Sequence, residues 1–488
     1  CPFSSVAMLG SVVVLWLFIL LLFFFIRVRR PKNFPPGPRP LPILGNLLQL
    51  DPANPLKDLE RLKRRYGNVF SLYIGSRPAV VLNGLEVVRE ALVTRAAEYA
   101  GRPTHLMISH LFKGKGVVMA NYGSSWRDHR RFALTTLRNF GLGKRSMEER
   151  ILEEVSHICT ELESSAGTVS HTHNVLSNII CSLIFGERFE YDDPVILTLI
   201  QRLEEFIKEA VGPWAMVQSK PCTTPCLLKR VPKWFFEHIK KVVTKHKNSR
   251  VAGEPRDLLD CYLDQIDKTA EEGSTFNDTQ MVSLLLDLFM AGTDTTSNTL
   301  RSAMLHLMTN QHVQDRCHRE IAEVLEGRAD ASFEDRHAMP YVQATIHEAQ
   351  RMSDTVPLSV FHTTCSDTQL HSYQLPQGTT VIPNLSSVLH EEGQWKFPHE
   401  FNPENFLNEV GEFVKPEAFL PFSAGSRVCL GEGLARMELF LVLVTLLRRF
   451  RFVWPEDGGV PDFSLIFGGT QSPKPYRLGV RLRSSERG

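Results

Sequence analysis

Neither sign of charge is in excess in this chain. It has 55 Lys and Arg against 54 Asp and Glu, which gives a formal net charge of +1 over 488 residues, and no long single-sign tail stands out. Nucleic-acid-binding proteins normally show a basic excess in their composition. The charge balance therefore argues against that class, and charge must be judged locally.

Cysteine is sparse and does not form a paired framework. The 9 cysteines are odd in number and irregular in spacing, unlike the disulfide scaffold of a small secreted domain. Cys222 and Cys226 are close enough to suggest a metal site, but no second Cys pair or His pair lies near them at zinc spacing. Reduced, mostly buried thiols are the preferred interpretation, and only Cys429 has neighbours that suggest chemistry.

A specific glycine-rich phosphate loop after a predicted strand is also missing, which argues against a built-in nicotinamide or flavin domain. Residues 69–74 and 79–82 flank a turn at 75–78 and predict a hairpin, and 379–384 predict another strand. Most of the remainder has helical periodicity, clearest at 85–97, 145–164, 196–210, 279–309, 311–326, 341–352 and 432–449. The sequence predicts a mainly α (α+β) fold, with one large helical domain and a small antiparallel sheet.

The N-terminal region carries a long hydrophobic run. Residues 6–26 contain no charge, and a helix of about 21 residues rises about 31 Å, enough to cross a bilayer. A cleaved signal peptide is the alternative, but its apolar part would be shorter and its basic residues would come first. Here the basic residues follow the run, which places the rest of the chain in the cytosol; they are Arg27, Arg29, Arg30 and Lys32.

A proline-rich stretch, FPPGPRPLP, begins at Phe34. Proline fixes φ and lacks an N–H, so this run cannot continue the helix and forms a stiff extended connector. A ligand for a proline-binding partner domain is the alternative, but its place between membrane and globule favours a spacer. We therefore expect a transmembrane anchor at 1–30, a hinge at 31–45 and the functional domain at 46–488.

The sequence PFSAGSRVCLGE near the C-terminus has five positions that suit a haem-bound thiolate: Phe422, Gly425, Arg427, Cys429 and Gly431. The two glycines would let the backbone approach the macrocycle and turn into the next helix. Phe422 would cover the sulfur, and Arg427 could reach a haem propionate. The helix starting near Gly431 would point its positive end at the sulfur. A buried free cysteine in a turn would explain Cys429 but not these neighbours.

On these residues, and from the anchor to the C-terminus, the sequence resembles the cytochrome P-450 superfamily. Stretches such as VFSLY at 69–73 are most similar to its microsomal family-two branch, which oxidises drugs and fatty acids. The resemblance implies haem b (iron protoporphyrin IX) with Cys429 as the iron ligand, whose thiolate favours O–O cleavage. It also implies insertion of one oxygen atom from O2 into lipophilic substrates such as xenobiotics, fatty acids, eicosanoids or steroids.

The resemblance also implies the partners and the location of the enzyme. Electrons would come from NADPH through a separate FAD/FMN reductase of the microsomes, with cytochrome b5 as an optional second partner. The protein would sit in the endoplasmic reticulum membrane with its catalytic domain on the cytoplasmic face. Basic residues between 127 and 150 would form the face that steers the acidic reductase, and an ordinary solvated helix is the alternative; they are Arg127, Arg130, Arg131, Arg138, Lys144, Arg145 and Arg150.

Proton delivery is assigned by the resemblance to the motif MAGTDTTS, which lies in a long apolar helix. Thr295 can hydrogen-bond back to the preceding turn, and Asp294 supplies a carboxylate next to it. An acid and an alcohol with water can relay the two protons that oxygen activation consumes, so Asp294 and Thr295 are the predicted catalytic residues. Gly292 and Ala291 would let the helix approach the cofactor; close helix packing is the alternative.

Further residues are assigned by the same resemblance. Trp126 and Arg130, four apart on a helix, and His362 would contact haem propionates, although a solvated basic helix and a satisfied histidine are the alternatives. Glu348 and Arg351, three apart on one helix face, would form the structural pair that locks the core near the haem loop. The third member of that group is usually basic, and here it is Asn405, a neutral amide that would have to bridge by hydrogen bonds.

The predicted substrate pocket is apolar, which suits lipophilic substrates. Asp287 stands one turn before Ala291, where it would either attract a cationic amine or accept hydrogen bonds from loop N–H groups, the second being preferred. A peroxide-rearranging haem-thiolate isomerase or dehydratase and a haem sensor or carrier are rival functions, and the Asp294–Thr295 pair argues against both. The pocket residues are Phe112, Val118, Phe206, Asp287, Leu288, Val356, Leu358 and Phe467.

Overall fold

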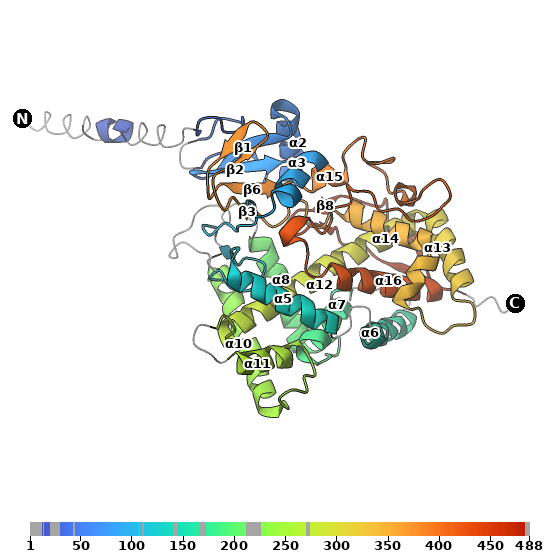
Figure 1. Cartoon of the computed structure of the whole chain (residues 1–488). Helices are drawn as coiled ribbons and strands as arrows, with labels where there is room; N and C mark the ends of the chain where they lie inside the picture. Colours follow the sequence, from blue (N-terminus) through green and yellow to red (C-terminus); the bar gives the residue numbers. More distant parts are fainter. Residues whose placement is uncertain are drawn as a thin grey trace, which may run out of the picture.

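The computed structural model describes residues 12, 14–19, 30–41, 44–106, 108–109, 112–139, 145–164, 172–210, 226–269 and 274–483. Helices dominate this part of the chain, and a small sheet stands at one side of the helical body (Figure 1). The longer helices are α2 (Pro55–Tyr66), α3 (Leu85–Arg89), α5 (Ser124–Asn139), α6 (Arg145–Ser164), α7 (Thr172–Phe185), α8 (Pro194–Ala210), α10 (Cys226–Ser249), α11 (Leu258–Lys268), α12 (Asp278–Thr309), α13 (Gln311–Val324), α14 (Pro340–Ser353), α15 (Ser386–Leu389) and α16 (Glu432–Arg449). The mainly helical fold is confirmed.

Short helical turns link these elements: η1 (Leu47–Gln49), η2 (Glu90–Thr94), η3 (Phe333–Ala338), η4 (Pro403–Phe406) and η5 (Gly425–Arg427). Most predicted helices are found within two residues of their expected bounds. The stretch 85–97 differs, because α3 ends at Arg89 and gives way to the π-helical turn η2. The carbonyl of Leu92 in η2 lies against the backbone of Gly425, a tertiary contact that helical periodicity does not reveal.

The main sheet has the strand order β1-β2-β6-β3. Its hairpin is confirmed, although the turn is shorter than predicted because β2 starts at Arg77. The prediction of an antiparallel sheet is wrong for this sheet as a whole, since β2 and β6 run parallel. Residues about 300 apart in the chain pair here, which local patterns cannot show. The strands are β1 (Val69–Ile74), β2 (Arg77–Leu82), β3 (His362–Thr363), β4 (Thr368–Leu370), β5 (Tyr373–Leu375), β6 (Thr380–Pro383), β7 (Phe450–Val453), β8 (Leu465–Ile466), β9 (Ser472–Pro473) and β10 (Gly479–Leu482).

Helix α12 forms the centre of the helical body. It has 32 residues, so it is about 48 Å long, and it packs against α7, α14 and α16. Its start is fixed by Asn277, whose side chain accepts the backbone N–H of Gln280. Most of its side chains are buried on every side, as expected for a helix in the core of a large domain.

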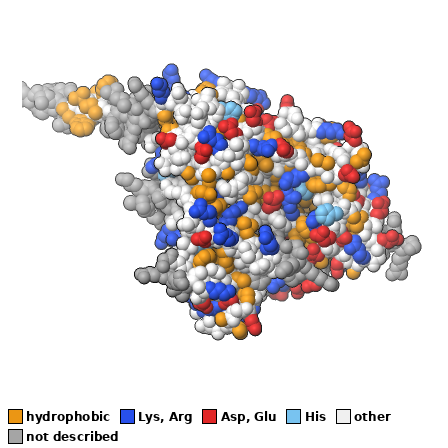
Figure 2. All heavy atoms as spheres, viewed as in Figure 1, with side chains coloured by type: hydrophobic (Ala, Val, Ile, Leu, Met, Phe, Trp, Pro, Cys, Tyr) orange, Lys and Arg blue, Asp and Glu red, His pale blue; other side chains and the backbone are white. Residues whose placement is uncertain are grey.

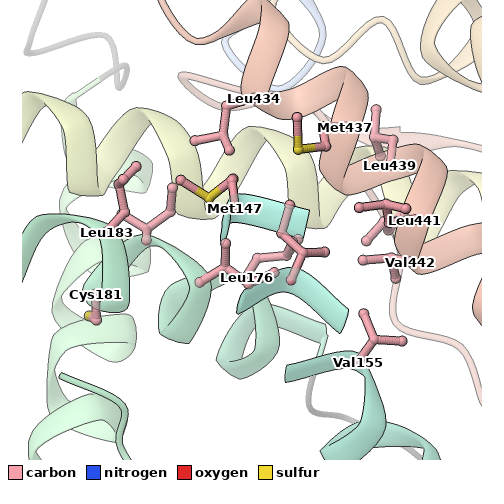
Figure 3. Packing of buried hydrophobic residues seen from close by; sticks show 14 of the residues in the cluster. Met147, Val155, Leu176, Cys181, Leu183, Leu434, Met437, Leu439, Leu441 and Val442 are labelled. Carbon is pink, nitrogen blue, oxygen red and sulfur yellow. The ribbon is translucent and has the colours of Figure 1, made fainter. Parts of the chain in front are cut away.

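The largest apolar cluster joins α6, α7 and α16. Figure 3 shows Met147 and Val155 of α6, Leu176 of α7, and Leu434 and Met437 of α16 facing one another in this cluster. α16 is apolar on almost all sides, because it is enclosed by α6, α12, α13 and α14. This packing fixes the helix that begins directly after the Cys429 loop.

The N-terminal segments lie partly outside the described residues, and this includes most of the expected anchor at 6–26. Among the residues that the structure does describe, none belongs to a helix long and apolar enough to cross a membrane. The proline-rich stretch is extended and docks on the sheet: Phe34 is buried, and the Ser71 hydroxyl donates to the Pro35 carbonyl at 2.7 Å. The boundaries at 30 and 45 stay predictions.

A buried polar cluster connects α10 and α11. His246 Nε2 lies 2.9 Å from Asp257 Oδ2, and Asp257 Oδ1 accepts the N–H of Asp260, which caps α11. Arg256 Nε donates to Asp260 at 2.6 Å. These three His and Asp side chains are near enough to one another to hold a metal ion, but their atoms already satisfy one another as an ion pair and a helix cap.

The His246–Asp257 pair predicts a pH-dependent stability. Burial opposes the charged imidazole, but the hydrogen bond and charge of Asp257 outweigh it, so the pKa of His246 is raised. The stabilisation is complete below the unfolded pKa of about 6.5 and is lost as the pH rises through the higher folded pKa. We expect His246→Gln to destabilise the protein more at about pH 6 than at about pH 9 in urea unfolding. Equal losses at both pH values would contradict this.

Candidate functional site

Cys429 lies in the loop between η5 and α16. The loop is closed by the N–H of Cys429, which donates to the Phe422 carbonyl at 2.9 Å, and by the N–H of Val428, which donates to Gly425 at 3.1 Å. Backbone N–H groups of Gly431 and Glu432 point at the sulfur, where α16 begins and its dipole is positive. Burial raises the pKa of the Cys429 thiol, while these N–H groups act in the opposite direction by favouring a thiolate.

The surroundings of Cys429 indicate an internal hollow. The side chain has accessible surface although its sulfur lies deep inside the protein; a residue that lines a hollow satisfies both observations. The otherwise buried helix α12 has a matching stripe, since Leu288, Ala291 and Thr295 keep accessible surface at helical spacing. α12 packs against α16, so we infer that the hollow lies between this stripe and the Cys429 loop.

Two glycines are required by packing within the protein. Gly425 has φ +72°, and a Cβ there would stand 1.6 Å from the Leu92 carbonyl, so glycine is needed where the loop packs against η2. Gly292 is similar, because its Cβ would stand 2.5 Å from Ile180 of α7, which is the close helix packing given as the alternative. The predicted approach of both residues to the cofactor stays a prediction. Only at Gly431 would a Cβ point towards the sulfur, at 4.0 Å.

Two buried guanidinium groups lie near the Cys429 loop. Arg427 donates to the carbonyls of Ala100, Val117 and Ala120, and Arg102 donates to those of Val118, Val360 and Phe361. Within the described residues no carboxylate pairs with either group. Burial lowers the pKa of both, that of Arg427 to about 10, and the charge of Arg130 lowers both further. The charge of Arg427 also lowers the pKa of Arg102. Buried positive charge without a carboxylate fits the two propionates of the predicted haem.

The other predicted propionate contacts surround this pair. The Trp126 ring lies under Arg427 at 4.1 Å from its guanidinium carbon, and its indole N–H donates to the Val117 carbonyl. Arg130 donates to the Val428 carbonyl at 2.5 Å, so it braces the cysteine loop. His362 Nδ1 lies 2.7 Å from the Tyr99 carbonyl in a buried position. The structure thus brings all three residues together with Arg427.

The predicted proton-delivery residues face different neighbours on α12. Thr295 donates to the Ala291 carbonyl at 2.7 Å, as predicted, and keeps surface on the hollow side. Asp294 is buried, and its Oδ2 accepts hydrogen bonds from Asn298 at 3.2 Å and from Thr470 at 2.5 Å. The carboxylate is therefore held against a C-terminal loop rather than beside the Thr295 hydroxyl.

Asp287 is a buried carboxylate bonded to loop N–H groups, which confirms the preferred alternative. Its Oδ2 accepts the N–H groups of Val117 at 2.6 Å and Val118 at 3.0 Å. Gly116, at φ +79°, allows this approach, because a Cβ there would stand 2.1 Å from the same oxygen. Burial raises the pKa of Asp287 to about 7, although the two N–H groups lower it. The contact fixes the loop that carries Val118 onto α12.

The apolar pocket residues fall into two groups. Phe112 meets Phe206 of α8 edge to face, with ring centroids 6.2 Å apart, and Val118 and Leu288 pack against the same cluster. Leu358 and Phe467 belong to a second cluster beside the main sheet. Val356, the remaining predicted pocket residue, is half-buried.

Glu348 and Arg351 form a fully buried ion pair on α14. Arg351 Nε and Nη2 each donate to a Glu348 oxygen at 2.8 Å, and both side chains are 0% exposed. Asn405 completes the group: its Nδ2 donates to Glu348 Oε1 at 3.1 Å, and its Oδ1 accepts the N–H of Phe397 at 2.8 Å. The neutral amide therefore bridges by hydrogen bonds, as the sequence suggested it would have to.

Sequence reasoning missed two residues of this region. Arg102 is a single arginine between a glycine and a proline, and nothing in that pattern indicates burial beside Arg427. Thr470 follows two glycines in a loop between β8 and β9, and only the fold brings it to Asp294. Neither residue could be found from its local sequence, because its partner lies far away in the chain: Thr470 meets Asp294 across 176 residues.

Comparison with known proteins gives one consistent result. The family model described as Cytochrome P450 matches residues 35–480. The chain is similar to Cytochrome P450 2D14 of Bos taurus, with 43% identity over 487 residues that cover 96% of this chain and 97% of the relative. It is 43% identical to Vitamin D(3) 25-hydroxylase of Sus scrofa over 93% of each chain. It is 42% identical to Cytochrome P450 2D6 of Homo sapiens over 97% of this chain and 98% of that protein.

The buried pair on α14 predicts a large stability loss on one conservative change. We expect Glu348→Gln to lower the free energy of unfolding by about 3–5 kcal/mol, because Arg351 would stay buried without its counter-charge. The matched control is Glu404→Gln, which removes the charge from the exposed pair with Arg316 and should cost at most about 1 kcal/mol. Urea unfolding of both variants measures the difference. Similar losses would show that the buried pair is not special.

Proposed function

Because the chain belongs to the cytochrome P450 family, it is a haem-thiolate monooxygenase that takes electrons from NADPH through a flavoprotein reductase, and we propose that Cys429 supplies the thiolate. The observation that carries this proposal is the position of Cys429, which keeps accessible surface although its sulfur lies deep inside the protein, where the N–H groups at the start of α16 point at it. Haem, when bound, supplies the activation of O2 and the transfer of one oxygen atom to the substrate.

The residues that would hold the haem follow from the charges around the hollow. Arg102 and Arg427 would neutralise the propionates, since both are buried cations without a carboxylate partner in the described part of the chain. His362 and Trp126 line the same side, and Arg130 would keep the cysteine loop in place through the Val428 carbonyl. Phe422, Gly425 and Gly431 would shape the loop, and Ala291 would border the cofactor from α12.

Proton delivery is proposed for Thr295 and Asp294. The Thr295 hydroxyl keeps accessible surface and donates its one hydrogen to the Ala291 carbonyl, so its oxygen can accept a hydrogen bond from a water. Asp294 is one residue earlier on α12 and provides the titratable group from which a proton would start. The two side chains point in directions about 100° apart around the helix, so water must connect them.

The substrate class is lipophilic, and we propose that the pocket wall is made by Phe112, Phe206, Leu288, Leu358 and Phe467. Their contacts form an apolar surface, and Val118 and Val356 extend it. The porcine relative is named for hydroxylation of vitamin D(3), a substrate of that chemical kind. We propose xenobiotics, fatty acids, eicosanoids or steroids as the range to be tested, and Asp287 as a fixed part of the pocket wall rather than a free anion.

The electron partner would dock on the exposed side of α5. Figure 2 shows Lys and Arg side chains gathered in the middle of the visible face, where Figure 1 places α5. Arg127, Arg131 and Arg138 are exposed there, whereas Arg130 and Arg150 are used inside the protein, by Val428 and Ser182. Lys144 lies outside the described residues.

We also propose that the protein is anchored in the endoplasmic reticulum membrane, with the domain at 46–488 on the cytoplasmic face. The support is the uncharged run at 6–26 followed by basic residues. Leu41 in the proline-rich stretch and Leu44 and Leu48 after it are 41%, 37% and 70% exposed, which suits a surface that touches lipid. Cytochrome b5 is proposed as a second electron donor for the same basic face.

The proposed iron ligand is tested by Cys429→Ser. We expect the variant to lose the ferrous carbonyl absorption typical of thiolate-bound haem, and to lose reductase-dependent product formation by about 100-fold or more. The measurement combines carbonyl spectra with NADPH use and product mass on a panel of lipophilic compounds. The control is Cys261→Ser, a half-buried thiol on α11. Intact absorption and turnover in Cys429→Ser would refute the assignment.

The basic face of α5 is tested by charge reversal. We expect Arg131→Glu to slow reduction by the flavoprotein about tenfold at low ionic strength, with the difference shrinking as salt screens the charges. Stopped-flow reduction at several salt concentrations measures this. Arg319→Glu, the same reversal at an exposed site on α13, is the control. If both variants were reduced at the wild-type rate in low salt, α5 would not be the docking surface.

A further inference from the structure

A loop distant in sequence holds the Asp294 carboxylate. The Thr470 hydroxyl donates to Asp294 Oδ2 at 2.5 Å, and Asn298 donates to the same oxygen at 3.2 Å. Thr470 lies between β8 and β9, 176 residues after Asp294. An aspartate on a helix has several staggered rotamers, and two donors on one oxygen select among them.

The donor is itself fixed by its neighbours. The N–H of Gln471 donates to the Thr355 carbonyl at 2.8 Å, and its Nε2 donates to the Asp354 carbonyl at 2.9 Å. Two residues later, the Pro473 carbonyl accepts a hydrogen bond from Arg301 of α12 at 3.2 Å. A donor whose own backbone is anchored on both the helix and the loop after α14 can hold a carboxylate at a defined position.

The same loop also reaches the second apolar cluster. Phe467 packs against this cluster, which includes Leu358, and Gly468 and Gly469 stand between Phe467 and Thr470. The residue that packs on the proposed pocket wall is therefore a different one from the residue that holds the acid.

We propose that Thr470 is a positioning residue for oxygen activation, which acts by holding the Asp294 carboxylate in the orientation from which it supplies protons to the hollow. This inference rests on the proposed role of Asp294 and Thr295, and it adds the C-terminal loop to the proton-delivery group. Thr470 does not touch the reacting atoms. Its hydroxyl acts only through Asp294, so its loss should affect how oxygen is used and leave substrate binding unchanged.

The test compares Thr470→Val, which keeps the shape and removes the donor, with Thr470→Ser, which keeps the donor. We expect Thr470→Val to lower the product formed per NADPH consumed about tenfold, with hydrogen peroxide released instead, because small misplacements of catalytic groups cost about that much or more. Thr470→Ser should stay near the wild type. Substrate affinity, from optical titration, should change less than about twofold in either variant.

A crystal structure of each variant supplies a readout that does not depend on turnover. We expect the Asp294 carboxylate to rotate away from the loop in Thr470→Val and to keep its place in Thr470→Ser. The inference is overturned if Thr470→Val couples NADPH to product like the wild type, if the Ser variant fails equally, or if coupling and substrate affinity fall together.

An Asp294→Asn variant, measured in parallel, distinguishes the proposed acid role of Asp294 from the positioning role of Thr470. If Asp294→Asn uncouples NADPH use from product and Thr470→Val does not, the acid role stands and the positioning role is wrong. If Asp294→Asn remains coupled, the proposed proton delivery fails, and the positioning role fails with it.

Discussion

The region around the Cys429 loop is built on two buried guanidinium groups that no carboxylate neutralises among the described residues. Arg102 and Arg427 are withdrawn from water, and in the part of the chain that the structure describes their charges face carbonyl oxygens and, for Arg427, the Trp126 ring. An unpaired buried charge costs several kcal/mol in a folded protein, so this interior favours an anionic partner strongly. The bonds of Arg427 to Ala100, Val117 and Ala120 also tie the cysteine loop to a segment more than 300 residues earlier. Arg427, which we propose to bind a haem propionate, thus also connects two distant segments of the fold.

Other buried ionisable groups of this protein are stabilised by partners within the same chain. Glu348 and Arg351 neutralise each other completely on α14, and Asn405 and nearby carbonyls use the remaining hydrogen-bonding positions. Asp287 has no cation among its bonded partners, and its pKa of about 7 shows that burial brings it close to protonation at neutral pH. These groups are satisfied without a ligand. The contrast with Arg102 and Arg427 separates charges that serve the fold from charges that serve a bound anion.

Local patterns in the sequence predicted what is local in the structure. Helices α6, α8, α12, α13, α14 and α16 follow the apolar periodicity closely, and Cys429 stood out because its neighbours lie within eight residues. Contacts between distant segments were beyond such reasoning. The parallel pairing of β2 with β6, the burial of Arg102 beside Arg427, and the packing of Gly425 on Leu92 each join segments that the chain separates widely. Gly425 and Gly292 were recognised as special positions, but the contacts of Gly425 with Leu92 and of Gly292 with Ile180 could not be read from the sequence.

Consecutive residues of a helix point in different directions, and this is important for Asp294 and Thr295 of α12. Thr295 belongs to the stripe that faces the hollow, whereas Asp294 is turned by about 100° towards the C-terminal loop. An acid facing the hollow directly would meet the apolar substrate pocket, where a carboxylate is costly to bury. Placed one residue earlier, it is stabilised by hydrogen bonds from Thr470 and Asn298. Asp294 therefore has the polar surroundings that a buried acid needs, whereas Thr295 has the accessible surface that its proposed role needs.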